Sequence, residues 1–265
     1  LRRCGGRTRK KVQRLPCLPS GRGTIVGMFR EFDIQGENVA VRCCGCRDAA
    51  NAAAAIPFVY LHSLGDSANQ VAERCADSGC PPFVLVSIEV PSWNDDLTPW
   101  ECPGVFADDE PFGGKAAEQL RKLEAIADEV ESNLAVRPAQ RCIAGYSLAG
   151  LFSAWAPFHI DLFDAVASAS GSMWYPGFAE YVATHDFCRS PRQAYFSLGS
   201  KEARTPSRLL RTVADGTRSV VHSYQAKGVE TIFESNPGNH FKEPDMRMAK
   251  AIRWALSERS KGDFA

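Results

Sequence analysis

The sequence predicts an α/β fold in which helices cover both faces of a mostly parallel sheet. Short, continuous apolar runs alternate with segments of helical periodicity along most of the chain, which is typical of parallel strands buried on both faces. With 265 residues, 45% of them hydrophobic and 23% charged, the chain is also long enough to bury a sizeable core. Right-handed crossovers would wind these elements into a three-layer sandwich.

The first two strands are expected to form an antiparallel edge of that sheet. The strand-like segments 24–34 and 39–44 are separated by a short turn and together resemble a hairpin. Further strands are expected over 58–61, 83–88, 140–144, 164–170, 194–198 and 229–234. Helices are expected over 68–77, 115–134, 148–156, 177–185, 207–227 and 244–258, and a loop rich in Pro, Trp and Asp over 91–114.

A candidate nucleophile stands where an expected strand meets an expected helix. Residues 145–150 read Gly-Tyr-Ser-Leu-Ala-Gly, so Ser147 has small residues on both sides. A sharp strand-to-helix turn strains the serine backbone and leaves room only for small side chains two residues away, which Gly145 and Ala149 provide. Alanine replaces the usual final glycine of G-x-S-x-G. The other interpretation is a buried strand whose serine caps the next helix, because short matches of this kind also arise by chance.

A candidate general base lies after the last expected strand. Functional groups on a parallel sheet collect at the carboxyl ends of its strands, and the Gly- and Pro-bearing loop that holds His240 lies at such an end. An imidazole there could accept the serine proton at neutral pH. We therefore expect His240 to be the base and three other histidines to be structural: His159, His185 and His222. For His62, at a strand end near the site, a structural role and a role beside the site both stay open.

A candidate orienting acid lies in the loop before the histidine strand. Glu202 comes four residues after the expected strand 194–198, so the chain order is nucleophile, acid, histidine. That order is associated with α/β-hydrolases. The alternative for Glu202 is a solvated loop carboxylate beside Lys201. Other carboxylates are less well placed, being before a strand or inside a helix: Asp161, Asp164 and Asp215.

An oxyanion hole would complete this site. Serine attack on an ester carbonyl places negative charge on oxygen, and two backbone N–H groups must already point toward it. The N–H of Leu148, directly after the serine, is one expected donor. The second is expected from the loop after strand 58–61, from Ser63 or Leu64.

The chain resembles the esterase branch of the α/β-hydrolases that includes esterase D-like proteins and ferric enterochelin esterases. The resemblance covers nearly all of residues 28–256 and depends on separated motifs: Val-Tyr-Leu-His (59–62), Asp-Leu-Thr-Pro (96–99), Phe-Gly-Gly (112–114), Gly-Tyr-Ser-Leu-Ala-Gly-Leu-Phe (145–152), Ala-Ser-Gly-Ser-Met-Trp (169–174), Phe-Ser-Leu-Gly (196–199) and Pro-Gly-Asn-His (237–240).

This resemblance implies a three-layer α/β-hydrolase sandwich with antiparallel N-terminal edge strands. It implies Ser147 as nucleophile, His240 as base and Glu202 as orienting acid. Trp174 would line the acyl or alcohol pocket, with core packing as the alternative. Two more residues beside the expected machinery are assigned to substrate binding: Tyr146 and His62.

We therefore expect a serine esterase that hydrolyses a small-molecule carboxylic ester through an acyl-enzyme on Ser147, without a cofactor or a metal. The sequence has no obvious basic cluster for a polyanionic iron-siderophore. Two alternatives remain, an acyltransferase on the same scaffold and a non-catalytic interaction protein. The sequence makes no prediction of the natural ester or the oligomeric state.

Charge distribution and cysteine content predict the location and the partners of the protein. Residues 1–27 hold eight of the 31 Lys and Arg residues and no Asp or Glu. Such an arm could contact nucleic acid or an anionic membrane, but we expect a disordered extension before a natural start at Met28, with the catalytic domain over 28–265. The ten cysteines lack zinc-site spacing, and there is no apolar run long enough to span a membrane. We expect free thiols in a cytoplasmic protein without nucleic-acid or membrane partners.

Overall fold

The computed structural model describes residues 29–45, 56–106, 108–134 and 137–257. The expected basic extension over 1–27 lies outside these residues.

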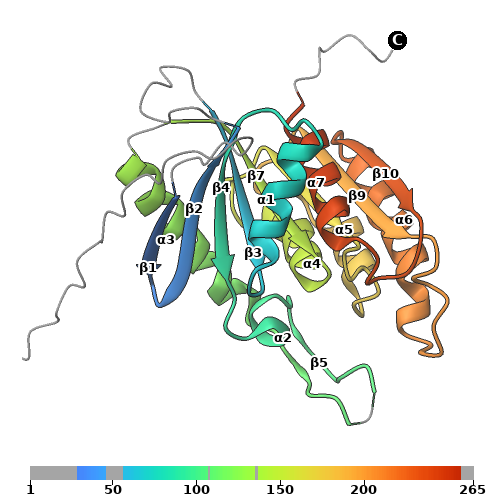
Figure 1. Cartoon of the computed structure of the whole chain (residues 1–265). Coiled ribbons are helices and arrows are strands. Elements are labelled where there is room, and N and C mark those ends of the chain that lie inside the picture. Colours follow the sequence, from blue (N-terminus) through green and yellow to red (C-terminus); the bar gives the residue numbers. More distant parts are fainter. Residues whose placement is uncertain (1–28, 46–55, 107, 135–136, 258–265) are drawn as a thin grey trace, which may run out of the picture.

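An eight-stranded sheet forms the centre of the molecule (Figure 1). Its strand order is β1-β2-β4-β3-β7-β8-β9-β10. The pairs β1–β2 and β2–β4 are antiparallel, and every other pair is parallel. The strand bounds are β1 Phe29–Ile34, β2 Glu37–Cys44, β3 Ile56–Ser63, β4 Phe83–Glu89, β7 Pro138–Tyr146, β8 Ala165–Ala169, β9 Gln193–Gly199 and β10 Glu230–Asn236.

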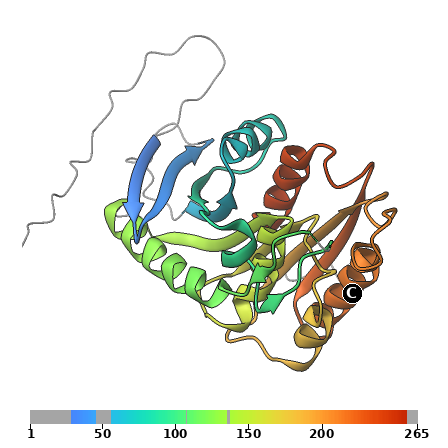
Figure 2. The ribbon, with the colours of Figure 1, turned by 90° about the horizontal axis from the view of Figure 1, so that it is seen from below.

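Helices cover both faces of the sheet and make three layers (Figures 1 and 2). The first face carries α1 (Ser67–Asp77) and α7 (Pro244–Ala255), which contact each other. The second face carries α3 (Ala116–Leu134), α4 (Leu148–Trp155), α5 (Phe178–Thr184) and α6 (Val213–Ala226). The predicted α/β sandwich with an antiparallel N-terminal edge is confirmed.

Alternation along the strands explains why the sheet is buried on both sides. In β3, Phe58 and Tyr60 pack into the core under α3 and α4, whereas Val59 and Leu61 pack under α1 and α7. Successive side chains of a strand point to opposite faces, so a continuous apolar run fills both cores. The exposed fractions of all four side chains are 3% or less.

Two expected segments differ from the structure in detail. The expected loop over 91–114 contains α2 (Trp93–Asp96) and a small hairpin of β5 (Glu101–Cys102) and β6 (Phe112–Gly113), which projects below the sheet in Figure 1. The helix expected from residue 207 begins as α6 at Val213, after the 3-10 turn η3 (Leu210–Thr212). Strands of two residues are too short to leave a periodic signal.

The cysteine prediction is correct at some positions and wrong at another. Cys75 and Cys142 are buried free thiols, and burial raises the pKa of the Cys142 thiol, which keeps it protonated. Cys43, in contrast, is disulfide-bonded. The expectation of free thiols therefore fails at Cys43.

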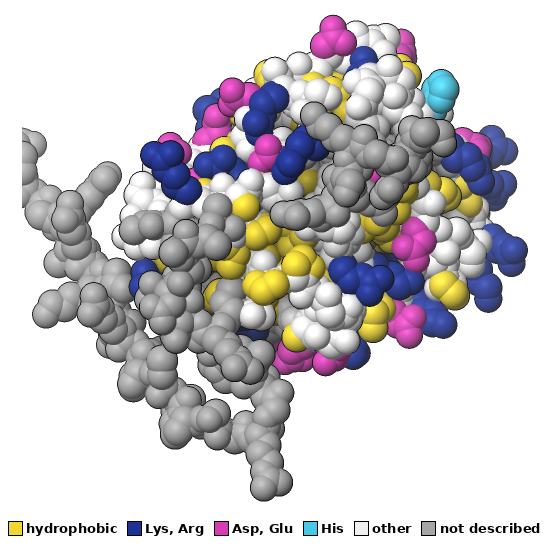
Figure 3. Space-filling view, turned by 90° about the horizontal axis from the view of Figure 1, so that it is seen from above, with side chains coloured by type: hydrophobic (Ala, Val, Ile, Leu, Met, Phe, Trp, Pro, Cys, Tyr) yellow, Lys and Arg dark blue, Asp and Glu magenta, His cyan; other side chains and the backbone are white. Residues whose placement is uncertain are grey.

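Charged side chains of both signs lie on the face of the molecule at the amino ends of the parallel strands. Figure 3 looks onto this face, where Lys and Arg side chains lie among Asp and Glu. Within the described part of the chain, every helix is too short or too polar to cross a bilayer.

Candidate active site

Ser147 occupies a strained turn between β7 and α4. Its φ and ψ angles are 60° and −122°, in a region that non-glycine residues rarely adopt. A Cβ at Gly145 would overlap the Ala149 carbonyl group and would lie 2.7 Å from the Ala149 Cβ. Because the nearest atoms belong to the backbone of residue 149, position 145 requires glycine whichever side chain stands at 149.

The structure brings three of the predicted side chains into one hydrogen-bonded chain. His240 Nε2 lies 3.1 Å from Ser147 Oγ, and His240 Nδ1 lies 2.8 Å from Glu202 Oε2. The three residues come from the loops after β7, β9 and β10. With Nδ1 protonated and donating to the carboxylate, Nε2 is left to accept the serine hydroxyl proton.

Glu202 is buried rather than solvated, so the alternative of an exposed loop carboxylate is wrong. Its side chain is 4% exposed. The second carboxylate oxygen, Oε1, accepts from Ser170 Oγ at 2.8 Å, from the Gly199 N–H and from Arg247 Nη1 at 2.9 Å. Burial raises the pKa of this carboxyl, but hydrogen bonds from His240, Gly199 and Ser170 outweigh burial and hold the pKa below its ordinary value. Glu202 is therefore ionised at neutral pH.

Arg247 on α7 was missed by the sequence analysis. It is 2% exposed and lies behind Glu202, on the side away from His240 Nδ1. Its sequence neighbours Met248 and Ala249 are apolar, but the exposed Arg253 also stands between apolar residues, so the sequence held no signal that singles out Arg247.

Tyr146 contacts the histidine loop. Its hydroxyl donates to the backbone carbonyl of His240 at 2.5 Å and accepts from Arg247 Nη1 at 3.3 Å. Burial raises the pKa of this phenol, which keeps the hydroxyl protonated as a donor. The hydroxyl is thus already engaged, and substrate binding by the ring of Tyr146 stays a prediction.

The expected oxyanion donors lie at or just beyond the ends of two neighbouring strands, β3 and β7. Leu61 of β3 pairs with Ala144 of β7, so the loop after β3 runs beside the Ser147 turn. Leu148 is the first residue of α4, and the first N–H groups of a helix have no intrahelical partner. The Leu64 N–H, however, donates to Ser67 Oγ at 3.2 Å and would have to leave that bond to bind an oxyanion.

Two more predicted substrate contacts have different surroundings. Trp174 is half-buried, with its ring centroid 5.8 Å from that of Phe112 and 5.9 Å from that of Tyr175, so part of it faces outward while the rest packs on the core. His62 is 2% exposed and lies edge-on to Phe152. Burial lowers the pKa of His62 to about 3, so the ring is neutral. Because the His62 side chain is buried, it has no exposed surface with which to contact a substrate, and the structure does not support that expectation.

The rival groups are engaged elsewhere. Asp164 accepts from the Arg141 N–H and pairs with Arg189, and Asp215 pairs with Arg218 within α6. Within the described residues, no cluster of three or more His, Cys, Asp or Glu side chains is arranged to hold a metal ion.

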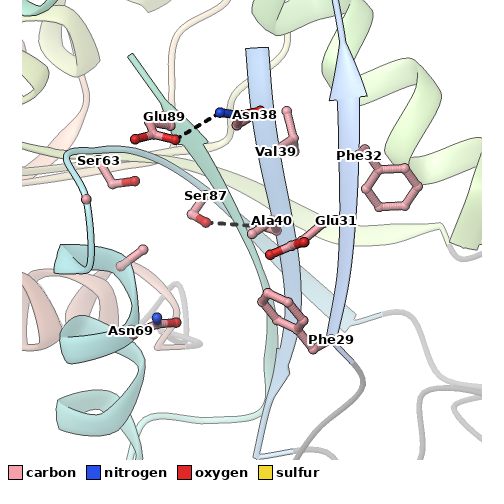
Figure 4. A pocket seen from close by; sticks show the side chains of 12 residues that line it. Phe29, Glu31, Phe32, Asn38, Val39, Ala40, Ser63, Asn69, Ser87 and Glu89 are labelled. Carbon is pink, nitrogen blue, oxygen red and sulfur yellow. Dashed lines mark hydrogen bonds between the residues drawn. The ribbon is translucent and has the colours of Figure 1, made fainter. Parts of the chain in front are cut away.

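A separate hollow of about 410 Å³ lies between α1 and the outer strands (Figure 4). Its wall includes Ser63 at the end of β3, Gly65 in the following loop, and the acidic side chains Glu31 and Glu89. Glu89 accepts a hydrogen bond from the Asn38 side chain. The three side chains of the hydrogen-bonded chain are not part of its lining.

Comparison with known proteins identifies the family of this chain. A family model described as "Putative esterase" matches residues 55–244. The uncharacterized protein YbbA of Bacillus subtilis (strain 168) is 30% identical over 183 residues, which are 66% of this chain and 73% of YbbA.

Solved structures share the fold. The siderophore hydrolase EstA from Aspergillus nidulans superposes with a TM-score of 0.68 at 19% identity, covering 91% of this chain and 97% of EstA. An IroE-like serine hydrolase from Shewanella oneidensis has a TM-score of 0.72 at 18% identity, covering 86% of this chain and 79% of its own. Both the expected resemblance and the expected fold are confirmed. The chain belongs to the esterase family that this model describes and is a hydrolase with the α/β-hydrolase fold.

Proposed function

We propose that the protein is a serine carboxylesterase that forms an acyl-enzyme on Ser147. The single observation that carries the proposal is the unbroken chain of hydrogen bonds from Ser147 through His240 to Glu202, at 3.1 and 2.8 Å, with the serine in a strained turn. A serine hydroxyl becomes nucleophilic when an oriented base within hydrogen-bond reach takes its proton.

In the proposed reaction, Ser147 Oγ attacks the ester carbonyl carbon while its proton passes to His240 Nε2. The Leu148 N–H and an N–H of the loop after β3 stabilise the negative oxygen. The proton on His240 then passes to the leaving alcohol, and the acyl-enzyme remains. His240 next activates a water molecule, which releases the carboxylic acid and restores Ser147.

The exposure of the base favours hydrolysis over acyl transfer. The His240 side chain is 31% exposed, so water can reach the imidazole without any movement of the surrounding loops. An acyltransferase excludes water from the acyl-enzyme so that an alcohol can compete for it.

The surroundings support an uncharged ester as the substrate. Phe241 is 84% exposed and its ring centroid lies 5.3 Å from that of His240, and Leu64, in the loop after β3, is 51% exposed. Trp174 lies two residues after Ser172, whose N–H donates to the Ser147 carbonyl at 3.0 Å, so the half-buried indole is near the nucleophile. The name of EstA points to siderophores for that protein. The exposed apolar groups of this chain favour a neutral acyl or alcohol group instead.

The test is hydrolysis of p-nitrophenyl acetate by the wild type, Ser147→Ala and the control Ser223→Ala. Ser223 lies on α6 and bonds only to its own helix, at the Ser219 carbonyl. We expect Ser147→Ala to lose the activity and Ser223→Ala to keep it. Added alcohol acceptors, with product analysis, distinguish hydrolysis from transfer. A folded wild type that cleaves no ester of a graded acyl series would contradict the proposal and favour an interaction protein.

A further inference from the structure

We propose that Arg247 is a positioning residue, whose guanidinium holds both Glu202 and the loop of His240 in the geometry that Ser147 requires. The inference depends on the proposed esterase function, because the geometry matters only if Ser147 reacts. Arg247 lies on α7, an element that contributes neither the serine, the histidine nor the carboxylate.

The contacts of Arg247 reach both partners at once. One nitrogen, Nη1, lies 2.9 Å from Glu202 Oε1, and the other, Nη2, donates to two carbonyls of the loop that carries His240. The full set of acceptors and distances is Glu202 Oε1 2.9 Å, Ser170 Oγ 2.9 Å and Tyr146 Oη 3.3 Å for Nη1, and Pro237 O 3.1 Å and Asn239 O 2.8 Å for Nη2. The guanidinium therefore links the loop after β9 to the loop after β10.

The surrounding backbone leaves the space that the guanidinium occupies. A Cβ at Gly199 would lie 2.9 Å from Arg247 Nη2, 2.9 Å from Glu202 Oε1 and 2.5 Å from the Gly238 carbonyl oxygen. Gly199 is the last residue of β9, and its φ is not positive, so the demand for glycine here is one of space. The absence of a side chain at 199 permits the close approach of Arg247 to Glu202.

Lysine could not make the same contacts. A guanidinium is a planar fork with donors on two nitrogens, so it can bind a carboxylate with one and carbonyls with the other. An ammonium group is a compact charge at a single atom. Arg247→Lys therefore keeps the positive charge but loses the hydrogen bonds to one of the two loops.

The charge of Arg247 has a separate effect on Glu202. The groups that face this carboxylate are His240 from the loop after β10, Arg247 from α7, Ser170 after β8 and the Gly199 N–H of β9. Of these, Arg247 carries a positive charge at every pH. Without it, protonation of Glu202 becomes easier, and a protonated Glu202 no longer accepts from His240 Nδ1. The acid limb of the pH–activity profile, where activity falls as the pH is lowered, would then move to higher pH.

The experiment compares Arg247→Lys, Arg247→Gln and the control Arg253→Gln, which removes an exposed arginine from the same helix. A fluorophosphonate burst titration counts reactive serines, so that kcat is expressed per active site and is not affected by misfolded protein. We expect Arg247→Lys to lower kcat by about tenfold or more, with KM within about twofold and an unchanged acid limb. Arg247→Gln should lower kcat by about 100-fold and also move the acid limb to higher pH. Arg253→Gln should match the wild type.

The inference is overturned if both Arg247 variants keep the wild-type kcat per titrated site and the wild-type pH profile. Such variants could still melt at a lower temperature, and Arg247 would then be a merely structural arginine. If Arg247→Gln does not fold, Arg247→Lys decides by kcat and KM. A wild type that reacts with neither the ester nor the fluorophosphonate overturns the proposed function itself, and this inference with it. A reactive wild type with unaffected Arg247 variants overturns this inference alone.

Discussion

Replacing Glu202 by glutamine tests the role of the buried carboxylate with almost no change in shape. Three donors converge on Oε1, from Ser170, Gly199 and Arg247, while Oε2 faces His240 Nδ1 at 2.8 Å. Glutamine has a single acceptor oxygen and an NH₂ group. The oxygen will take the Oε1 position, because three donors already point there, and the NH₂ group will face His240.

The direction of the effect follows from the proton on the imidazole. Facing an NH₂ donor, Nδ1 must accept, so the ring proton moves to Nε2, which faces Ser147 Oγ at 3.1 Å. In that tautomer His240 cannot take the serine proton. A wrong tautomer of this kind costs about 10³ to 10⁴ in kcat, or about 4 to 5.5 kcal/mol of barrier. KM should stay within about twofold, since the carboxylate does not bind substrate in ground or transition state.

The assay is p-nitrophenyl acetate hydrolysis at neutral pH, with circular dichroism to verify folding. Glu180→Gln, an exposed position on α5, is the matched control and should behave as the wild type. If folded Glu202→Gln retains kcat within about tenfold of the wild type, then Glu202 does not set the tautomer of His240, and the assignment of the orienting acid is refuted.

Three further predictions concern the turn, the pocket and pH. Gly145→Ala should lower the esterase activity by more than about 100-fold, because its Cβ would overlap the Ala149 carbonyl group; unchanged activity would refute a rigid turn. Trp174→Ala should lower kcat/KM for butyrate and benzoate esters more than for acetate, whereas a core role would lower the melting temperature and affect all esters equally. The pKa of Glu202 is depressed in the folded protein, so the ionised carboxylate stabilises the fold above about pH 4.5, and this stability is lost as the pH falls through the folded pKa. In urea unfolding from pH 3 to 7, the free energy of unfolding should therefore fall less toward low pH for Glu202→Gln than for the wild type.

The sequence predicted the positions of the strands, the mostly parallel sheet with its antiparallel edge, and the meeting of three side chains. Apolar runs gave the strands, and parallel strands with right-handed crossovers place their carboxyl ends at one edge. Ser147, Glu202 and His240 each follow a strand within a few residues, so their approach follows from topology.

Arg247 could not be identified in the same way, because its role depends on packing. Arg247, Lys250 and Arg253 all lie on α7, and the sequence does not separate the buried arginine from the exposed one. The contact of α7 with β8 and β9 decides which of them faces Glu202.

His62 shows the opposite error. It stands at the end of β3, as a site residue would, but alternation along the strand turns its ring toward Phe152. The predicted oxyanion donor Leu64 is a similar case. Its N–H donates to the Ser67 side chain, and a sequence motif does not show where that side chain lies.

The most direct test of the account is peptide mapping by mass spectrometry after reaction with a fluorophosphonate, because only an activated serine is phosphonylated. We predict one adduct per chain, on Ser147, which is absent in Ser147→Ala and forms far more slowly in His240→Ala. A folded protein that gains no adduct on Ser147, or gains it at the same rate without His240, would contradict the claim that this imidazole activates this hydroxyl.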